Sequence, residues 1–138
     1  MTETFKLEIT TPGKLVFSGQ VEMATIPGED GEFGVLAGHS ALISNLQAGG
    51  VVKVYANAND NESVSNRIFI AGGFAEVNPD EASILATEAY DLAKVTKEEI
   101  QAKITAAQAK LNTSESDFDK RRAQETVEMN ERILSYLG

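Results

Sequence analysis

The chain has 138 residues with 12 basic and 21 acidic side chains, so its formal net charge is −9. This length fits one domain, or a small domain with an appendage, and the lack of cysteine excludes disulfides and thiolate chemistry. A chain this acidic is a poor binder of nucleic acid and is repelled by anionic lipid headgroups. No apolar run of 18 residues and no secretory signal is present, so we expect no direct membrane insertion and a cytoplasmic location.

Residues 1–89 have the pattern of short β-strands. Phe5, Leu7 and Ile9 alternate with polar residues, which predicts a strand with one buried face. Further strands are expected at 15–17, 21–26, 51–55, 67–71, 75–77 and 82–87, with a break near residues 18–19, turns at 11–13 and 78–80, and a polar hairpin tip at 57–61. Short strands with regular turns predict a β-sandwich or a flattened barrel.

The segment from Pro27 to Leu46 concentrates glycine, carboxylates and the only histidine of the chain. Glycine at this density favours tight turns, so we expect a long acidic loop, held by the strands, where function is placed. The spacing Gly28-x-x-Gly31-x-x-Gly34 lacks the Gly-Lys-Ser/Thr ending of a phosphate loop. These glycines are therefore interpreted as turn residues.

The candidate site residues of this segment are Glu29, Asp30, Glu32 and His39. The three carboxylates do not have the spacing of a calcium loop, so they are either solvated surface charges or acceptors for a partner's hydrogen bonds. His39 has no nucleophile elbow near it and no cysteine to complete a metal site, so a structural or interface role is favoured over catalysis. We therefore expect no catalytic, metal-binding or cofactor-binding residue.

Residues 90–138 have helical patterns instead. Thr96 with Glu99 forms a capping-box pattern, and Ser114 with Asp117 forms a weaker one. Each is followed by an apolar stripe, the first at Ile100, Ile104, Ala107 and Leu111, the second at Phe118, Ala123, Val127, Ile133, Leu134 and Leu137. The polar break between them predicts an antiparallel hairpin. Its stripes are narrow and rich in alanine, so we hypothesise that the hairpin docks weakly and can detach or extend.

A basic group, Lys120, Arg121, Arg122 and Arg132, lies in the second predicted helix. One interpretation is a solvated helix face whose cations pair with neighbouring carboxylates. The alternative is a surface that docks on an acidic partner.

The segment Gly31-Glu-Phe-Gly-Val-Leu-Ala-Gly-His-Ser-Ala-Leu-Ile, followed by Leu46-Gln-Ala-Gly49, resembles the epsilon subunit of bacterial F-type ATP synthase, which corresponds to the mitochondrial delta subunit. The opening residues 5–19, the stretch 71–77 and Leu85-Ala86 are similar as well. The resemblance extends over nearly the whole chain and includes the order of strands and then helices.

This resemblance implies an α+β chain with a ten-stranded β-sandwich, residues 1–89, and a two-helix hairpin, residues 90–138. It implies a non-catalytic rotor subunit that contacts the gamma subunit and the c-ring, couples proton flow to ATP synthesis, and inhibits ATP hydrolysis through its hairpin in many bacteria. Glu32 then faces the c-ring, His39 lies near gamma, and the basic group meets the alpha/beta head. The implied location is peripheral, on the cytoplasmic face of the bacterial plasma membrane.

The first predicted helix departs from the family pattern. Some members bind ATP through an Ile/Leu-Asp-x-x-Arg-Ala motif, and here Glu98 replaces the aspartate and Gln101 the arginine. Loss of the guanidinium removes a phosphate-binding fork, so we expect no ATP binding.

Two alternatives stay open. A mitochondrial delta subunit without its presequence would have a similar sequence. A free-standing β-sandwich binding module, for example for carbohydrate, usually relies on exposed aromatic residues, whereas this chain has no tryptophan and three tyrosines.

Overall fold

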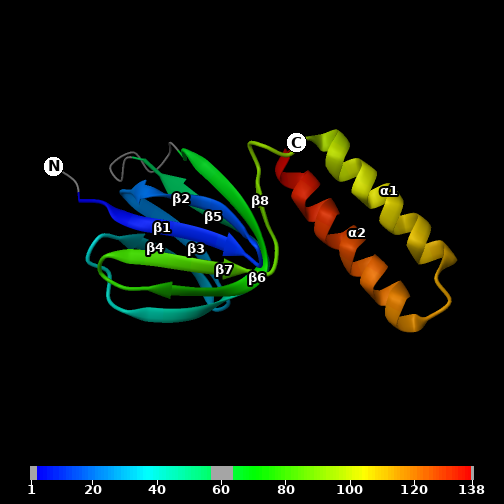
Figure 1. Ribbon diagram of the computed structural model, residues 1–138, viewed down its shortest axis with the longest axis horizontal. Coiled ribbons are helices and arrows are strands. Elements are labelled where there is room, and N and C mark those ends of the chain that lie inside the picture. Colours follow the sequence, from blue (N-terminus) through cyan, green and yellow to red (C-terminus); the bar gives the residue numbers. More distant parts are fainter. Residues whose placement is uncertain (1–2, 57–63, 138) are drawn as a thin grey trace. The chain divides into compact units, whose positions relative to one another are not determined.

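The computed structural model describes residues 3–56 and 64–137, which fall into a β-sandwich unit ending at residue 93 and a helical unit starting at residue 94 (Figure 1). The β-sandwich followed by a helical hairpin agrees with the predicted α+β class. The boundary expected after residue 89 lies four residues before this division, because Ala89–Asp91 still pairs with the sheet. The predicted hairpin tip at 57–61 lies outside the described residues.

The described part of the sandwich contains eight strands in one continuous sheet. They are β1 (Phe5–Thr11), β2 (Lys14–Val21), β3 (Met23–Gly28), β4 (Gly31–Leu36), β5 (Leu42–Tyr55), β6 (Asn66–Val77), β7 (Glu81–Ala86) and β8 (Ala89–Asp91). The order is β2-β1-β7-β6-β5-β3-β4, with β8 also paired to β6. Only the pairing of β1 with β7 is parallel among these described strands.

The expected number of ten strands is wrong for the described chain, because two long strands bend and serve both layers. The register of β5 shifts between Ala48 and Gly50, and β6 contains Gly72 and Gly73 at φ angles of +112° and +135°. Residues 73–77 of β6 pair with β7, whereas residues 68–70 pair with β8. The sheet therefore folds over at these glycines, where side chains would strain the backbone. Dividing both strands at their bends would restore the expected count.

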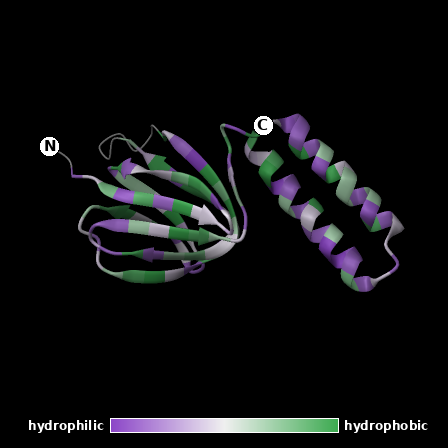
Figure 2. Cartoon of the chain, viewed as in Figure 1, coloured by the Kyte–Doolittle hydropathy of each residue, from purple (hydrophilic) through white to green (hydrophobic). Residues whose placement is uncertain are grey.

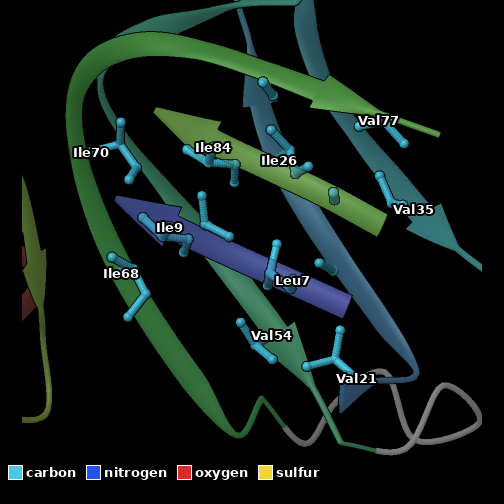
Figure 3. Close-up of a cluster of buried hydrophobic side chains, with 14 of the residues drawn as sticks. Leu7, Ile9, Val21, Ile26, Val35, Val54, Ile68, Ile70, Val77 and Ile84 are labelled. Carbon is cyan, nitrogen blue, oxygen red and sulfur yellow. The ribbon is translucent and has the colours of Figure 1, made fainter. Parts of the chain in front are cut away.

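The core lies between the two layers (Figure 3). Leu7 and Ile9 of β1 point inward, as their alternation predicts, and meet side chains of the second layer such as Ile26 and Ile68. Burying each such side chain contributes about 1.5–3 kcal/mol. Hydrophobic and hydrophilic residues alternate along the strands, as expected when one face is buried (Figure 2).

Both predicted turns of the sandwich are confirmed, and one predicted break is wrong. Gly13 has a φ of +81° at the β1–β2 turn, and the Asn78 side-chain carbonyl accepts hydrogen bonds from the backbone N–H groups of Asp80 and Glu81 at 2.9 and 3.0 Å. The break near residues 18–19 does not occur, because Gly19 pairs with Leu7 inside an uninterrupted β2.

The hairpin consists of α1 (Lys97–Thr113) and α2 (Asp117–Leu137). The Thr96 hydroxyl caps α1 by accepting a hydrogen bond from the Glu99 N–H at 3.2 Å, as predicted. Ile100, Ile104 and Ala107 are buried, and Leu111 is half-buried. The first helical stripe is thus confirmed. Among the described residues, no helix is both long and apolar enough to cross a bilayer.

The predicted start and stripe of α2 need correction. Ser114 is the C-cap of α1, and Ser116 caps α2 by accepting a hydrogen bond from the Asp119 N–H at 3.2 Å. Phe118 is 65% exposed, so it does not belong to the buried stripe. The buried positions of α2 are Ala123, Val127, Asn130 and Ile133. Asn130 escaped prediction because its polar side chain does not register in an apolar pattern.

Candidate functional site

The segment from Pro27 to Leu46 consists of the β3–β4 hairpin, a short connection at residues 37–41 and the start of β5, so the predicted long loop is wrong. Gly28 pairs with Gly31, which leaves only Glu29 and Asp30 in the turn between β3 and β4. A Cβ on Gly28 would lie 2.8 Å from the Gly31 carbonyl oxygen and 3.0 Å from the Phe33 ring. The glycine is therefore required for close packing inside a strand, whereas sequence reasoning assigned it to a loop.

The three carboxylates of this hairpin face solvent. Glu29 and Asp30 are exposed at the turn, which is tied to β5 by a hydrogen bond from the Glu29 N–H to the Asn45 carbonyl at 2.8 Å. Glu32 is exposed on β4, opposite Pro27. None of the three forms an ion pair with a cation of the described residues. Their oxygens are thus available to accept hydrogen bonds from a partner.

His39 follows β4 at the other end of that strand and is not grouped with the Glu29–Asp30 turn. Its Nδ1 lies 2.6 Å from the Ser40 carbonyl oxygen, to which it donates, and its ring centroid is 6.5 Å from that of Phe33. These contacts orient the ring without a carboxylate or hydroxyl partner for acid–base work. The described residues also contain no group of three His, Asp or Glu side chains that could hold a metal ion.

The basic residues of α2 do not form one cluster. Lys120, Arg121 and Arg122 are exposed in the first turns, and Arg132 lies ten residues after Arg122, a rise of roughly 15 Å along the helix. The Arg122 guanidinium lies over the exposed Phe118 ring, 5.8 Å from its centroid. The three leading cations make no ion pair with Asp117, Asp119 or Glu125 among the described residues, which leaves them available to an acidic partner.

Glu98 and Gln101, the two residues that differ from the ATP-binding motif, line a shallow groove of about 960 Å³ on the hairpin. Its walls are formed by Lys97, Glu98, Gln101, Ala102, Thr105, Ala106, Ala109 and Leu134. At the position of the motif arginine, Gln101 presents a neutral amide. Lys97 is the single cation among these lining residues, and Glu98 beside it would repel a phosphate.

Sequence reasoning missed an exposed apolar band on the outer face of the layer formed by β2, β1, β7 and residues 73–77 of β6. The band comprises Leu15, Leu85 and Phe74, which are 56%, 43% and 41% exposed. Register places them in one row across the sheet, since Phe74 pairs with Leu85, Leu85 with Thr10, and Thr10 with Leu15. The alternation of the strand contained a signal for this band. Phe74 precedes the buried Ala75, and successive residues of a strand point to opposite faces, so the Phe74 side chain points outward.

Comparison with known proteins agrees with this architecture. Residues 4–91 match the family described as ATP synthase, Delta/Epsilon chain, beta-sandwich domain. The chain is 38% identical over 135 residues to the ATP synthase epsilon chain of Rhodospirillum rubrum, covering 98% of this chain and 97% of the relative. It is also 38% identical over 123 residues to the epsilon chain of Paramagnetospirillum magneticum, covering 89% of each.

Two solved structures share the fold. A chain from the cryo-EM structure of the Euglena gracilis mitochondrial ATP synthase, OSCP/F1/c-ring in rotational state 1, matches with a TM-score of 0.71 and 26% identity, covering all of this chain and 84% of that one. A chain from the Tetrahymena thermophila mitochondrial central stalk and c-ring matches in fold, with a TM-score of 0.55 at 14% identity over 96% of this chain and 98% of that one. The chain therefore belongs to the ATP synthase epsilon family, whose members are non-catalytic subunits of that complex.

Proposed function

We propose that this chain is a central-stalk subunit of a bacterial F-type ATP synthase and couples proton movement through the c-ring to ATP synthesis. The observation that carries this proposal is the apolar band of Leu15, Leu85 and Phe74. Large apolar side chains that share one row on the outer face of a sandwich, here with Thr10 between Leu15 and Leu85, are typical of a docking surface. A subunit that transmits torque needs such a surface, because its contact with the neighbouring stalk subunit must persist through each turn.

The residues beside the band define the chemistry of its partner. Ser83 pairs with Glu76 on one side and Glu8 on the other, so a polar and acidic row runs parallel to the band. Ile43, opposite Glu76 on β5, is 71% exposed. A matching surface presents apolar side chains with lysine or arginine beside them. We assign this surface to the gamma subunit.

The β3–β4 hairpin is proposed to contact the c-ring. Glu29 and Asp30 protrude at its turn, and Glu32 follows on β4, so three unpaired carboxylates face one region of solvent. They suit the polar loops of the c-ring, whose backbone and side-chain donors would satisfy them. His39, fixed against Phe33, is proposed to lie at the gamma side of this contact.

The helical unit is proposed to restrain ATP hydrolysis. Residues 94–138 carry eight basic and eight acidic residues, whereas residues 1–93 carry four basic and thirteen acidic ones. The unpaired Lys120, Arg121 and Arg122 therefore suit an acidic surface on the alpha/beta head. The assembled complex would hold the chain peripherally, at the cytoplasmic face of the plasma membrane.

Co-purification tests the rotor assignment. The tagged chain is isolated from native membranes in mild detergent, and its partners are identified by mass spectrometry. Gamma and c subunits in stoichiometric yield are expected with the parent chain. Phe74→Glu should lose most of the gamma subunit, because it places a charge in the apolar band.

The matched control is Gln47→Glu, which adds the same charge at an exposed position of β5 outside the band. It should retain gamma. Failure of the parent chain to retain gamma and c subunits, with its circular dichroism intact, would overturn the rotor assignment. Equal loss in both variants would instead remove the band as the gamma contact.

A further inference from the structure

The seam between the two helices of the hairpin contains a buried polar side chain, Asn130. It is 2% exposed, and among the described residues it is the one polar residue in the buried class. Its stripe continues to Val127 on one side and Ile133 on the other, both 4% exposed or less. The spacing of Ala123, Val127 and Asn130 is that of core positions in a helical pair.

The amide of Asn130 is satisfied only on one side. Its Nδ2 donates to the Thr126 carbonyl of the preceding turn at 2.8 Å, while Oδ1 has no hydrogen-bond partner among the described residues. A buried carbonyl without a partner has lost its hydration and gained nothing in return. Separation of the helices would expose this oxygen to water, so the penalty applies to the closed pairing alone.

The apolar contacts that oppose this penalty are small. Two of the buried seam residues are alanines, Ala107 and Ala123. The larger aliphatic residues buried in the described seam are Ile100, Ile104, Val127 and Ile133. The cost of one orphaned carbonyl is of the same order as the gain from burying one of these aliphatic side chains, so it offsets part of the attraction across the seam.

We propose that Asn130 is a built-in opening element of the hairpin. Its unpaired carbonyl keeps the closed pairing of α1 and α2 weak, so that the helices separate readily. This property belongs to the isolated chain and holds whichever partner the hairpin meets, so its test is independent of the rotor assignment.

Hydrogen exchange of the full chain, followed by mass spectrometry, tests the proposal. Asn130→Leu has nearly the same shape without the carbonyl and should slow exchange of peptides from α1 and α2 about tenfold. Asn130→Asp places a charge at the same point and should accelerate their exchange about tenfold. Peptides from the sandwich serve as the internal reference and should not change.

Asn112→Leu is the matched control, because Asn112 is an exposed asparagine of α1. Its hairpin peptides should exchange at the parent rate. The proposal is overturned if Asn130→Leu exchanges as fast as the parent chain, if Asn112→Leu slows exchange equally, or if Asn130→Leu loses helix content, which would mean that the amide supports the pairing.

Discussion

Gly73 is the position where one added methyl group should damage the sandwich most. The residue has a φ of +135° at the bend of β6, and a Cβ built there would lie 2.0 Å from the Leu85 carbonyl oxygen and 2.8 Å from the Ala86 Cα. Both atoms belong to the backbone of β7, which pairs with β6 at this point. The neighbour therefore cannot yield by rotating a side chain.

Gly31 offers a control with nearly the same φ angle. Its φ is +136°, and a Cβ there would meet no atom within 4 Å. Gly31→Ala should therefore cost only the conformational term, about 2 kcal/mol. Gly73→Ala adds the displacement of β7, with the loss of about two ladder hydrogen bonds and local repacking, or about 3 kcal/mol more.

The total for Gly73→Ala, about 5 kcal/mol, is comparable with the whole stability of a small domain. Urea denaturation followed by circular dichroism measures the free energy of unfolding of both variants. The melting temperature should fall by roughly 8–16 °C for Gly31→Ala and by much more for Gly73→Ala. Stabilities of the two variants within 1 kcal/mol, on the order of a single hydrogen bond, would refute the argument that backbone approach dictates glycine at this bend.

Three further predictions concern the cap, a tyrosine and the groove. Thr96→Ala should destabilise α1 by about 1 kcal/mol, seen as faster hydrogen exchange in its first turn and contradicted by an unchanged rate. Burial and the Glu88 carboxylate raise the pKa of Tyr90 from 10.0 to about 12, so the stability due to its neutral phenol is present below pH 10 and is lost as pH rises through about 12. Phenolate absorbance should show a late step that Tyr90→Phe removes; a Tyr90 midpoint near 10 would contradict it. ATP should give no binding heat with the parent chain in calorimetric titration, because Gln101 lacks the guanidinium, and tight binding would refute this.

The helical part shows how far local patterns reach. Thr96, Ile100 and Ile104 occupy the predicted cap and stripe, because capping and amphipathicity depend on residues a few positions apart. Phe118 was assigned to the wrong face, although its spacing of nine residues from Val127 places the two on opposite sides of a helix. The predicted start of α2 was wrong as well, because a start depends on which residue caps the helix. That start is fixed by the Ser116 cap, which competes with the equally plausible Ser114 in sequence.

The residue types of the candidate site are visible in the sequence, whereas their arrangement is visible only in the structure. The exposed carboxylates Glu29, Asp30 and Glu32 lie in one hairpin, as their proximity in sequence required, whereas the strand character of that hairpin was hidden by its glycines. The apolar band was not predicted, because Leu15, Phe74 and Leu85 come from three strands and become neighbours only through register.

The sequence by itself determined the two-part architecture, the inward face of β1 and the first helix, together with the acidic, cysteine-free character that limits the partners. These properties are local or additive, so periodicity and composition contain them. Only the tertiary structure decided the bending of β5 and β6 through two layers, the row of apolar side chains on the outer face, and the burial of Asn130 between two helices. Each of these depends on segments distant in sequence that meet in space, where register and close packing rather than residue type determine which side chains lie together.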